Sequence, residues 1–149
     1  MEDSVSSNTV DKSSNSMGNC TSNASTKRVG KDIRGNVMSL NIRGLVNKDH
    51  DKLLKLSQLT KLKNIVILAL QETHARGLES NETNIPGFRE FAQNRSMRAC
   101  GGVSTYVDER FTVKDVLGFS NDYVEVICIR IIELDLDVIN IYRPPPVSC

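Results

Sequence analysis

The amino-acid sequence predicts an α+β domain, or a mixed β-sheet with helices outside it. The first observation behind this prediction is a strand–helix–strand pattern over residues 36–70. The second is a pair of strand patterns, residues 124–132 and 136–142, joined by a short acidic connection that suits an antiparallel hairpin. The composition fits a globular domain, since 39% of the 149 residues are hydrophobic and 25% are charged.

The first half of the pattern is the clearest. The segment "NVMSLNI" (residues 36–42) alternates like a strand, with Met38, Leu40 and Ile42 on one face. In "DKLLKLSQLTKLK" (residues 51–63) leucines recur every three residues, as on one face of an amphipathic helix. The next strand, residues 65–70, is a continuous apolar run, which predicts that both of its faces are covered.

The second half alternates between turns and strands. Residues 81–87 are expected to form a loop, with Pro86–Gly87 as a turn signal. Three strands are predicted after it, at residues 102–107, 124–132 and 136–142. The run Pro144–Pro146 should end the last strand, because proline has no N–H to donate to a ladder.

The two ends of the chain differ in composition. Residues 1–30 are dominated by Ser, Asn and Thr and show no apolar period. Such a segment buries too little apolar surface to offset its ordering entropy, so we expect residues 1–30 to be disordered and one folded region to span residues 36–149. The N-terminus also lacks the apolar core of a signal peptide, so we expect an intracellular protein, nuclear or cytoplasmic and not secreted.

Composition also excludes several classes of partner. Nineteen basic and eighteen acidic residues give a net charge of +1, so only a local patch is expected to attract nucleic acid. No apolar run approaches the roughly 18 residues of a membrane span, and no small-molecule cofactor motif is present. The four cysteines fit no zinc spacing and are expected to be free thiols, while the oligomeric state stays open.

Four polar residues stand out at strand ends, and they are Asn41, Glu72, Asn140 and Tyr142. Polar groups there often border a cleft, and a carboxylate beside an amide suits Mg²⁺, which prefers oxygen ligands and keeps several waters. A tyrosine hydroxyl can bond a phosphate oxygen, as phosphodiester hydrolysis requires. Spacing alone is explained more simply if Glu72 is a surface carboxylate and Tyr142 is an aromatic residue at the edge of a sheet.

A family resemblance adds to this reading. The segments "MSLNIRGL", "ILALQETH", "GGVSTYV" and "VINIYRPP" occur in this order between Met38 and Pro145. They resemble the first four blocks of the endonuclease/exonuclease/phosphatase superfamily. More narrowly, they are similar to the apurinic-endonuclease-like domain of non-LTR (LINE-type) retrotransposons. The resemblance implies a four-layered α/β sandwich with two mixed β-sheets, Mg²⁺-dependent phosphodiester cleavage, and DNA as the partner.

The same resemblance implies roles for individual residues. Asn41 corresponds to the asparagine that helps organise the metal and nucleophile region, and Glu72 to the metal-binding glutamate. Tyr142 corresponds to the catalytic tyrosine that contacts the scissile phosphate. Gly101–Gly102 begin a strand where a missing side chain permits close approach. His74 belongs to the retrotransposon version of its block, with no role assigned.

The sequence also departs from the family. The later blocks, which supply an aspartate–asparagine pair, a further aspartate and a C-terminal aspartate–histidine pair, do not occur before Cys149. We therefore expect the N-terminal half of an endonuclease domain, inactive as it stands, with Mg²⁺ bound weakly if at all. An apolar surface that includes Val126, Cys128, Ile139 and Ile141 should then be left uncovered.

Two other interpretations stay open. The chain is alternatively a working hydrolase whose remaining half is encoded elsewhere or missing from this sequence. Otherwise it is a domesticated, non-catalytic fragment that binds nucleic acid or protein.

Overall fold

The structure is a computed structural model that describes residues 34–45, 51–75, 77–78, 82–94 and 100–144. The chain divides into two units, Met1–Asp32 and Ile33–Cys149, and all described residues lie in the second. The predicted disordered segment, residues 1–30, is outside the described residues, as are Pro145 and Pro146. The described elements are β1 (Asn36–Asn41), α1 (Asp51–Leu62), β2 (Ile65–Gln71), β3 (Phe88–Gln93), β4 (Val103–Asp108), β5 (Val113–Ser120), β6 (Glu125–Ile131) and β7 (Leu136–Tyr142).

The first sheet has the strand order β1-β2-β4-β3 and is mixed. β1 runs parallel to β2, whereas β4 runs antiparallel to both β2 and β3. All six residues from Ile65 to Leu70 are buried, which confirms the prediction from their continuous apolar run. The parallel β1–β2 pair matters for function, because it brings the carboxyl ends of both strands to one edge.

The second sheet has the order β5-β6-β7 and is antiparallel in its described strands. The predicted hairpin is confirmed: β6 and β7 pair from Ile131–Leu136 at the turn to Glu125–Tyr142 at the far end. Burial alternates along β6, where Glu125, Ile127, Ile129 and Ile131 are buried and the residues between them are only partly buried. This alternation is the sign of a strand covered on one face.

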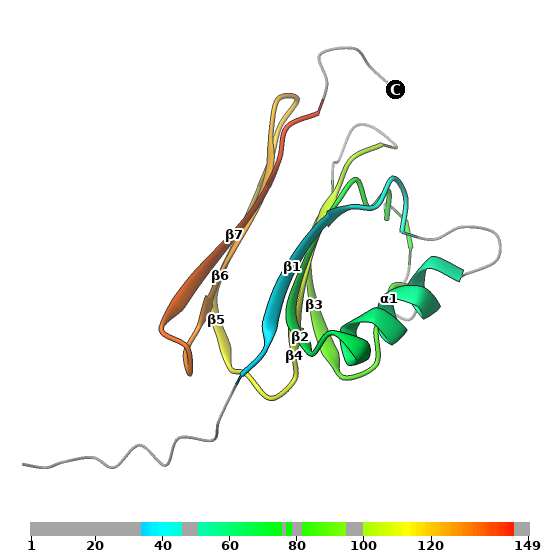
Figure 1. Cartoon of the computed structure of the whole chain (residues 1–149). Coiled ribbons are helices and arrows are strands. Elements are labelled where there is room, and N and C mark those ends of the chain that lie inside the picture. Colours follow the sequence, from blue (N-terminus) through cyan, green and yellow to red (C-terminus); the bar gives the residue numbers. More distant parts are fainter. Residues whose placement is uncertain (1–33, 46–50, 76, 79–81, 95–99, 145–149) are drawn as a thin grey trace, which may run out of the picture. The chain divides into compact units, whose positions relative to one another are not determined.

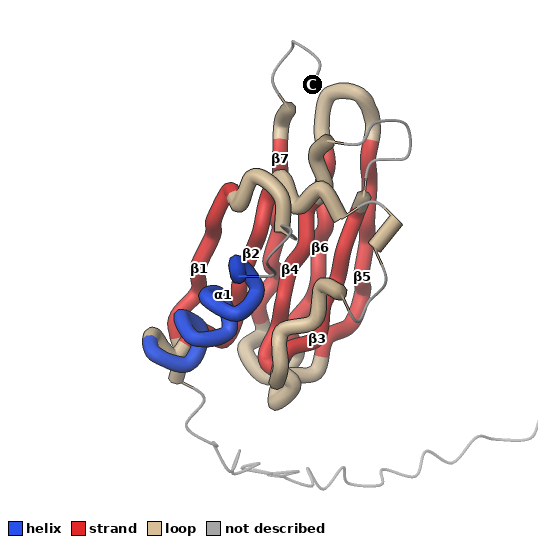
Figure 2. Tube along the Cα trace, turned by 90° about the vertical axis from the view of Figure 1, so that its right-hand side faces the viewer, coloured by secondary structure: helices blue, strands red, loops and turns tan. Residues whose placement is uncertain are grey.

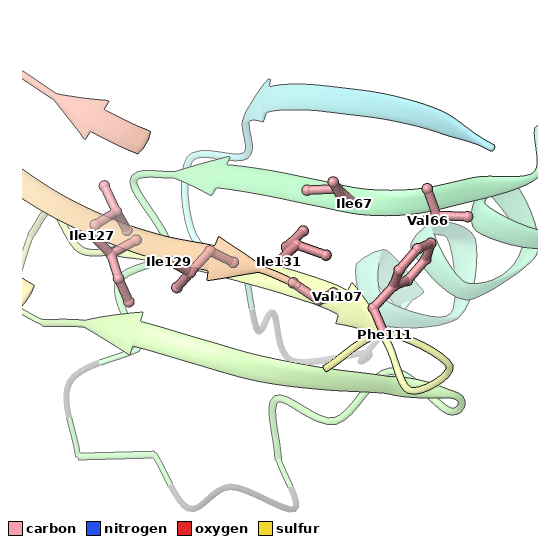
Figure 3. Packing of buried hydrophobic residues seen from close by; sticks show 8 residues of the cluster. Val66, Ile67, Val107, Phe111, Ile127, Ile129 and Ile131 are labelled. Atoms are coloured by element: carbon pink, nitrogen blue, oxygen red, sulfur yellow. The ribbon is translucent and has the colours of Figure 1, made fainter. Parts of the chain in front are cut away.

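The two sheets pack face to face over an apolar core, with Val66, Ile67 and Val107 of the first sheet opposite the β6 isoleucines (Figure 3). α1 covers the other face of the first sheet through Leu56, which packs with Leu68 and Tyr106. Figure 1 shows the first sheet lying between α1 and the second sheet. These layers confirm the predicted α+β class with two packed sheets, although the second sheet is antiparallel in its described strands where the resemblance implied a mixed one.

The predicted helix is also confirmed, and α1 lies across one side of the strands in Figure 2. Asp51 in its first turn and Lys61 in its last complement the helix dipole. No helix in the described ranges is long and apolar enough to cross a membrane.

The outward face of the second sheet is largely apolar. It carries Leu117 and Phe119 on β5, Val126 and Cys128 on β6, and Ile139 and Ile141 on β7, and the Arg130–Asp137 ion pair lies on the same face near the turn. Ile139 and Ile141 are 59% and 56% exposed, as expected, whereas Val126 and Cys128 are partly buried between the flanking strands.

Two strands were missed by sequence analysis, namely β3 and β5. β5 lacks a clean period because its register shifts between Lys114 and Leu117, and Asp115 there has a positive φ of 52°. β3 is short and carries charged residues, and it forms a strand because β4 supplies a partner along its whole length. In both cases pairing with a neighbour overrides a weak local signal.

Candidate active site

Three of the predicted residues meet at one carboxylate oxygen. Asn41 is the last residue of β1, Glu72 follows β2, and Tyr142 is the last residue of β7. The Asn41 amide donates from Nδ2 to Glu72 Oε1 at 2.9 Å, and the Tyr142 hydroxyl donates to the same oxygen at 2.7 Å. The two donors come from different sheets, so the site lies where the sheets face each other.

The backbone around Glu72 is tightly fixed. Beyond the β1–β2 ladder, the amides of Ile42, Gly44 and Leu45 donate to the carbonyls of residues 71, 72 and 73 at 2.9, 2.6 and 2.7 Å. Arg43 and Glu72, which face each other across this extension, have positive φ angles of 48° and 54°. Such angles cost a non-glycine residue about 1–3 kcal/mol and gather at functional sites, where the surrounding structure holds them.

The glycine pair performs the role that the resemblance implied. Gly101 and Gly102 have φ angles of +102° and +92°, and a Cβ on either would collide, with Glu125 and with Thr73 respectively. Their bare backbone allows close contact, since the His74 amide donates to the Gly101 carbonyl at 2.8 Å. Buried Glu125 accepts the Gly102 amide from the opposite side. The glycines thus let β6 and the chain after β2 approach each other.

Electrostatics favour the charged form of Glu72. The hydrogen bond from Asn41, and next that from Tyr142, hold the pKa of the Glu72 carboxyl below its usual range. Partial burial opposes the shift, whereas the electrostatic influence of His74 and Arg43 lowers this pKa further. Glu72 is therefore a carboxylate at neutral pH, the form that binds a cation.

Asn140, the fourth predicted residue, shares the inward face of β7 with Tyr142, as predicted, but it is 2% exposed. Its Nδ2 donates to the Leu70 and Ser104 carbonyls, both at 3.1 Å, and its Oδ1 accepts from Gln71 Nε2 at 2.7 Å. Asn140 therefore ties the sheets together beneath the site. Gln71 was missed as its partner, although it stands in the same "QETH" block as Glu72.

His74, which sequence analysis left without a role, is exposed beside the site. Its ring lies against Gly44, because a Cβ on that glycine would sit 3.5 Å from His74 Nδ1. His74 thus lies close enough to Glu72 to lower the pKa of its carboxyl electrostatically.

The described residues fit a magnesium ion only minimally. They contain no group of three or more His, Cys, Asp or Glu side chains that could enclose a metal. Glu72 receives both hydrogen bonds on Oε1, and the Asn41 Oδ1 accepts the Arg43 amide at 3.2 Å. Mg²⁺ commonly binds one or two carboxylates together with waters and substrate phosphate, so Glu72 supplies the least that such a site needs.

No protein-family model matches the sequence, and no curated protein matches it significantly. A crystal structure of TDP2 from C. elegans matches the fold with a TM-score of 0.52 and 22% identity over 69% of this chain. Structures of selenomethionine-labelled and truncated C. elegans TDP2 match with TM-scores of 0.52 and 0.51, both at 22% identity, over 74% and 69% of this chain.

The likeness to the TDP2 structures shows that this chain shares their fold. The chain spans 33%, 35% and 43% of the lengths of the three TDP2 chains. Less than half of each neighbour is therefore represented here.

Proposed function

We propose that this chain is the N-terminal part of a Mg²⁺-dependent phosphodiesterase that nicks DNA, of the non-LTR retrotransposon type, and that it is inactive as it stands. The observation that carries the proposal is the convergence of Asn41 and Tyr142 on Glu72 Oε1. The donors lie 31 and 70 residues from Glu72 in sequence. The TDP2-like fold supports the superfamily, and the "QETH" and "YRPP" segments favour the retrotransposon branch.

Each residue has a role in this proposal. Glu72 would hold Mg²⁺, which when bound would stabilise the negative charge that develops on a phosphate. Asn41 keeps Glu72 ionised and oriented through its hydrogen bond. Tyr142 would turn its hydroxyl from Glu72 towards a phosphate oxygen of DNA. Exposed Arg43 adds positive charge for the anionic backbone, and exposed His74 lies beside the site, where it can donate a hydrogen bond.

Inactivity follows from the residues that are lacking. The described site has one carboxylate and no buried histidine to activate water. Loss of general-base catalysis alone costs about 10²–10⁴ in rate, and the loss grows when groups that act as a unit are missing together. DNA as substrate would place the protein in the nucleus or cytoplasm.

Metal binding tests the proposed site directly. Titration of the full chain with Mg²⁺ should give weak binding, with a dissociation constant above about 1 μM, because one carboxylate plus waters is a poor site without phosphate. Glu72→Gln should abolish this binding, whereas Glu133→Gln, which removes a carboxylate paired with Thr112, should not. Binding that does not depend on Glu72 would overturn the proposed metal site.

Nicking of supercoiled plasmid tests the proposal that the chain is inactive as it stands. The chain should show no Mg²⁺-dependent nicking above a Glu72→Ala control. Nicking that requires both Glu72 and Tyr142 would instead show that these residues suffice for hydrolysis and that the chain is a working enzyme. If the chain binds neither Mg²⁺ nor DNA, the result supports the alternative that it is a non-catalytic fragment that binds protein. The exposed apolar residues on the outward face of β5–β7 are consistent with such a role.

A further inference from the structure

Lys52, in the first turn of α1, makes an unusual set of contacts. Its ammonium group donates to three consecutive backbone carbonyls, those of Ile42, Arg43 and Gly44, at 3.0, 3.1 and 2.8 Å. A lysine ammonium has three N–H donors, so these carbonyls use all of them. Lys52 thus joins the helix to the turn that follows β1.

Helix stability does not explain why a lysine occupies this position in the first turn of α1. A cation near a helix N-terminus opposes the helix dipole, whereas Asp51 beside it is favourable there. Lys55, three residues further along the helix, behaves as a surface lysine: it pairs with Asp51 across one turn, and 70% of its side chain is exposed. The local cost at position 52 therefore points to a role outside the helix.

The turn that Lys52 holds carries part of the candidate site. Asn41 precedes it, and its Oδ1 accepts the Arg43 amide at 3.2 Å while its Nδ2 donates to Glu72. Gly44 in the same turn donates its amide to the Glu72 carbonyl at 2.6 Å. In this turn Arg43 has a positive φ of 48°, which a non-glycine residue holds only with outside support, whereas Gly44 adopts its φ of 88° without strain.

We propose that Lys52 is a positioning residue, which orients Asn41 and the Glu72 carboxylate by gathering the three carbonyls of residues 42–44 around its ammonium group. It touches neither the Glu72 carboxylate nor any reacting group, and it acts through the turn. The proposal rests on the proposed function only in assigning Glu72 as the metal-binding carboxylate.

Site-resolved hydrogen exchange of the full chain tests this role without metal or DNA, so its result is independent of nicking. Lys52→Met keeps the aliphatic stem and removes the donors. We expect amide exchange at Ile42, Gly44 and Leu45 to accelerate by at least about tenfold, while protection in β4 stays unchanged. The NMR signal of the Asn41 side-chain amide should shift in the same variant.

Two further variants make the outcome decisive. Lys55→Met, on the same helix, should leave both readouts unchanged, and Lys52→Arg, which restores a multi-donor cation, should recover most of the protection at residues 42–45. Uniform loss of protection across the sheet, or unchanged exchange at residues 42–45 in Lys52→Met, overturns the proposal. If Lys52→Met does not fold, Lys52→Arg decides: retained local protection and an unshifted Asn41 signal support the role, and their loss in an otherwise protected sheet overturns it.

Discussion

The two sheets of this molecule are built from similar apolar strands but are covered differently. In the first sheet, β2 lies between α1 and the second sheet, and Ile65 to Leu70 are all buried. In the second sheet, Ile139 and Ile141 on β7 and Leu117 and Phe119 on β5 are each more than half exposed. Apolar residues on both faces of a strand therefore predict a need for two covering layers, and among the described strands only β2 and β4 of the first sheet have both.

The difference has an energetic consequence. Apolar surface removed from water contributes about 25 cal/mol per Å², so the covered face of the first sheet stabilises the fold while the outward face of the second contributes little. An exposed apolar face beside open strand edges is also a site for association. On β5 the register shift at Lys114–Leu117 interrupts the outer edge, whereas β7 pairs with β6 without a shift.

The largest expected effect comes from truncating matched residues on the two sheets. Leu68 is fully buried beneath α1. The substitution Leu68→Ala should lower the unfolding free energy of the protein by about 2–5 kcal/mol, because it leaves a cavity in a packed layer. Ile139→Ala on the exposed face should cost below about 1 kcal/mol. Urea unfolding of the full chain measures both. Equal losses would mean that the outward face of the second sheet is covered in solution.

A smaller effect should appear in surface behaviour. The double substitution Ile139→Thr with Ile141→Thr keeps β-branched side chains but makes the outward face more polar. We expect fluorescence of a bound hydrophobic dye to fall by about twofold or more and self-association in sedimentation to weaken. Val37→Thr, at a 61% exposed position of β1, is the matched control and should change neither readout. An equal response in the control would show that the outward face of the second sheet is not the main site of dye binding or self-association.

β2 and the β6–β7 hairpin were predictable because long apolar runs and a short acidic turn are local signals. The grouping of Asn41 and Tyr142 around Glu72 could be predicted only from the family resemblance. No local pattern shows it, because the three residues meet only when the two sheets pack together. Lys52 was not found, because a lysine on a polar helix face has the pattern of a solvated one and its contacts to carbonyls depend on the tertiary turn.

The smallest expected effect lies at the junction of the sheets, in the pKa of Glu72. Tyr142, from the second sheet, stabilises the carboxylate by donating a hydrogen bond, so Tyr142→Phe should raise this pKa towards its ordinary value. Asn41→Ala, which removes the stronger contribution from the first sheet, should raise it further. The NMR shift of the Glu72 carboxyl carbon, followed through an acid titration, measures both changes.

The sign of the stability effect follows from the direction of the pKa shift. A carboxyl whose pKa is lowered on folding contributes stability that is present above the unfolded-state pKa and is lost as the pH falls through the folded-state pKa. Tyr142→Phe should therefore reduce the unfolding free energy at neutral pH. In strong acid, where Glu72 is protonated in both the folded and the unfolded state, this pH-dependent loss should disappear, and only the pH-independent effect of removing the hydroxyl should remain. Tyr123→Phe, at a 78% exposed tyrosine, should leave the Glu72 titration unchanged. An unaltered titration in Tyr142→Phe would mean that the second sheet does not reach Glu72 in solution, and the site would then belong to the first sheet alone.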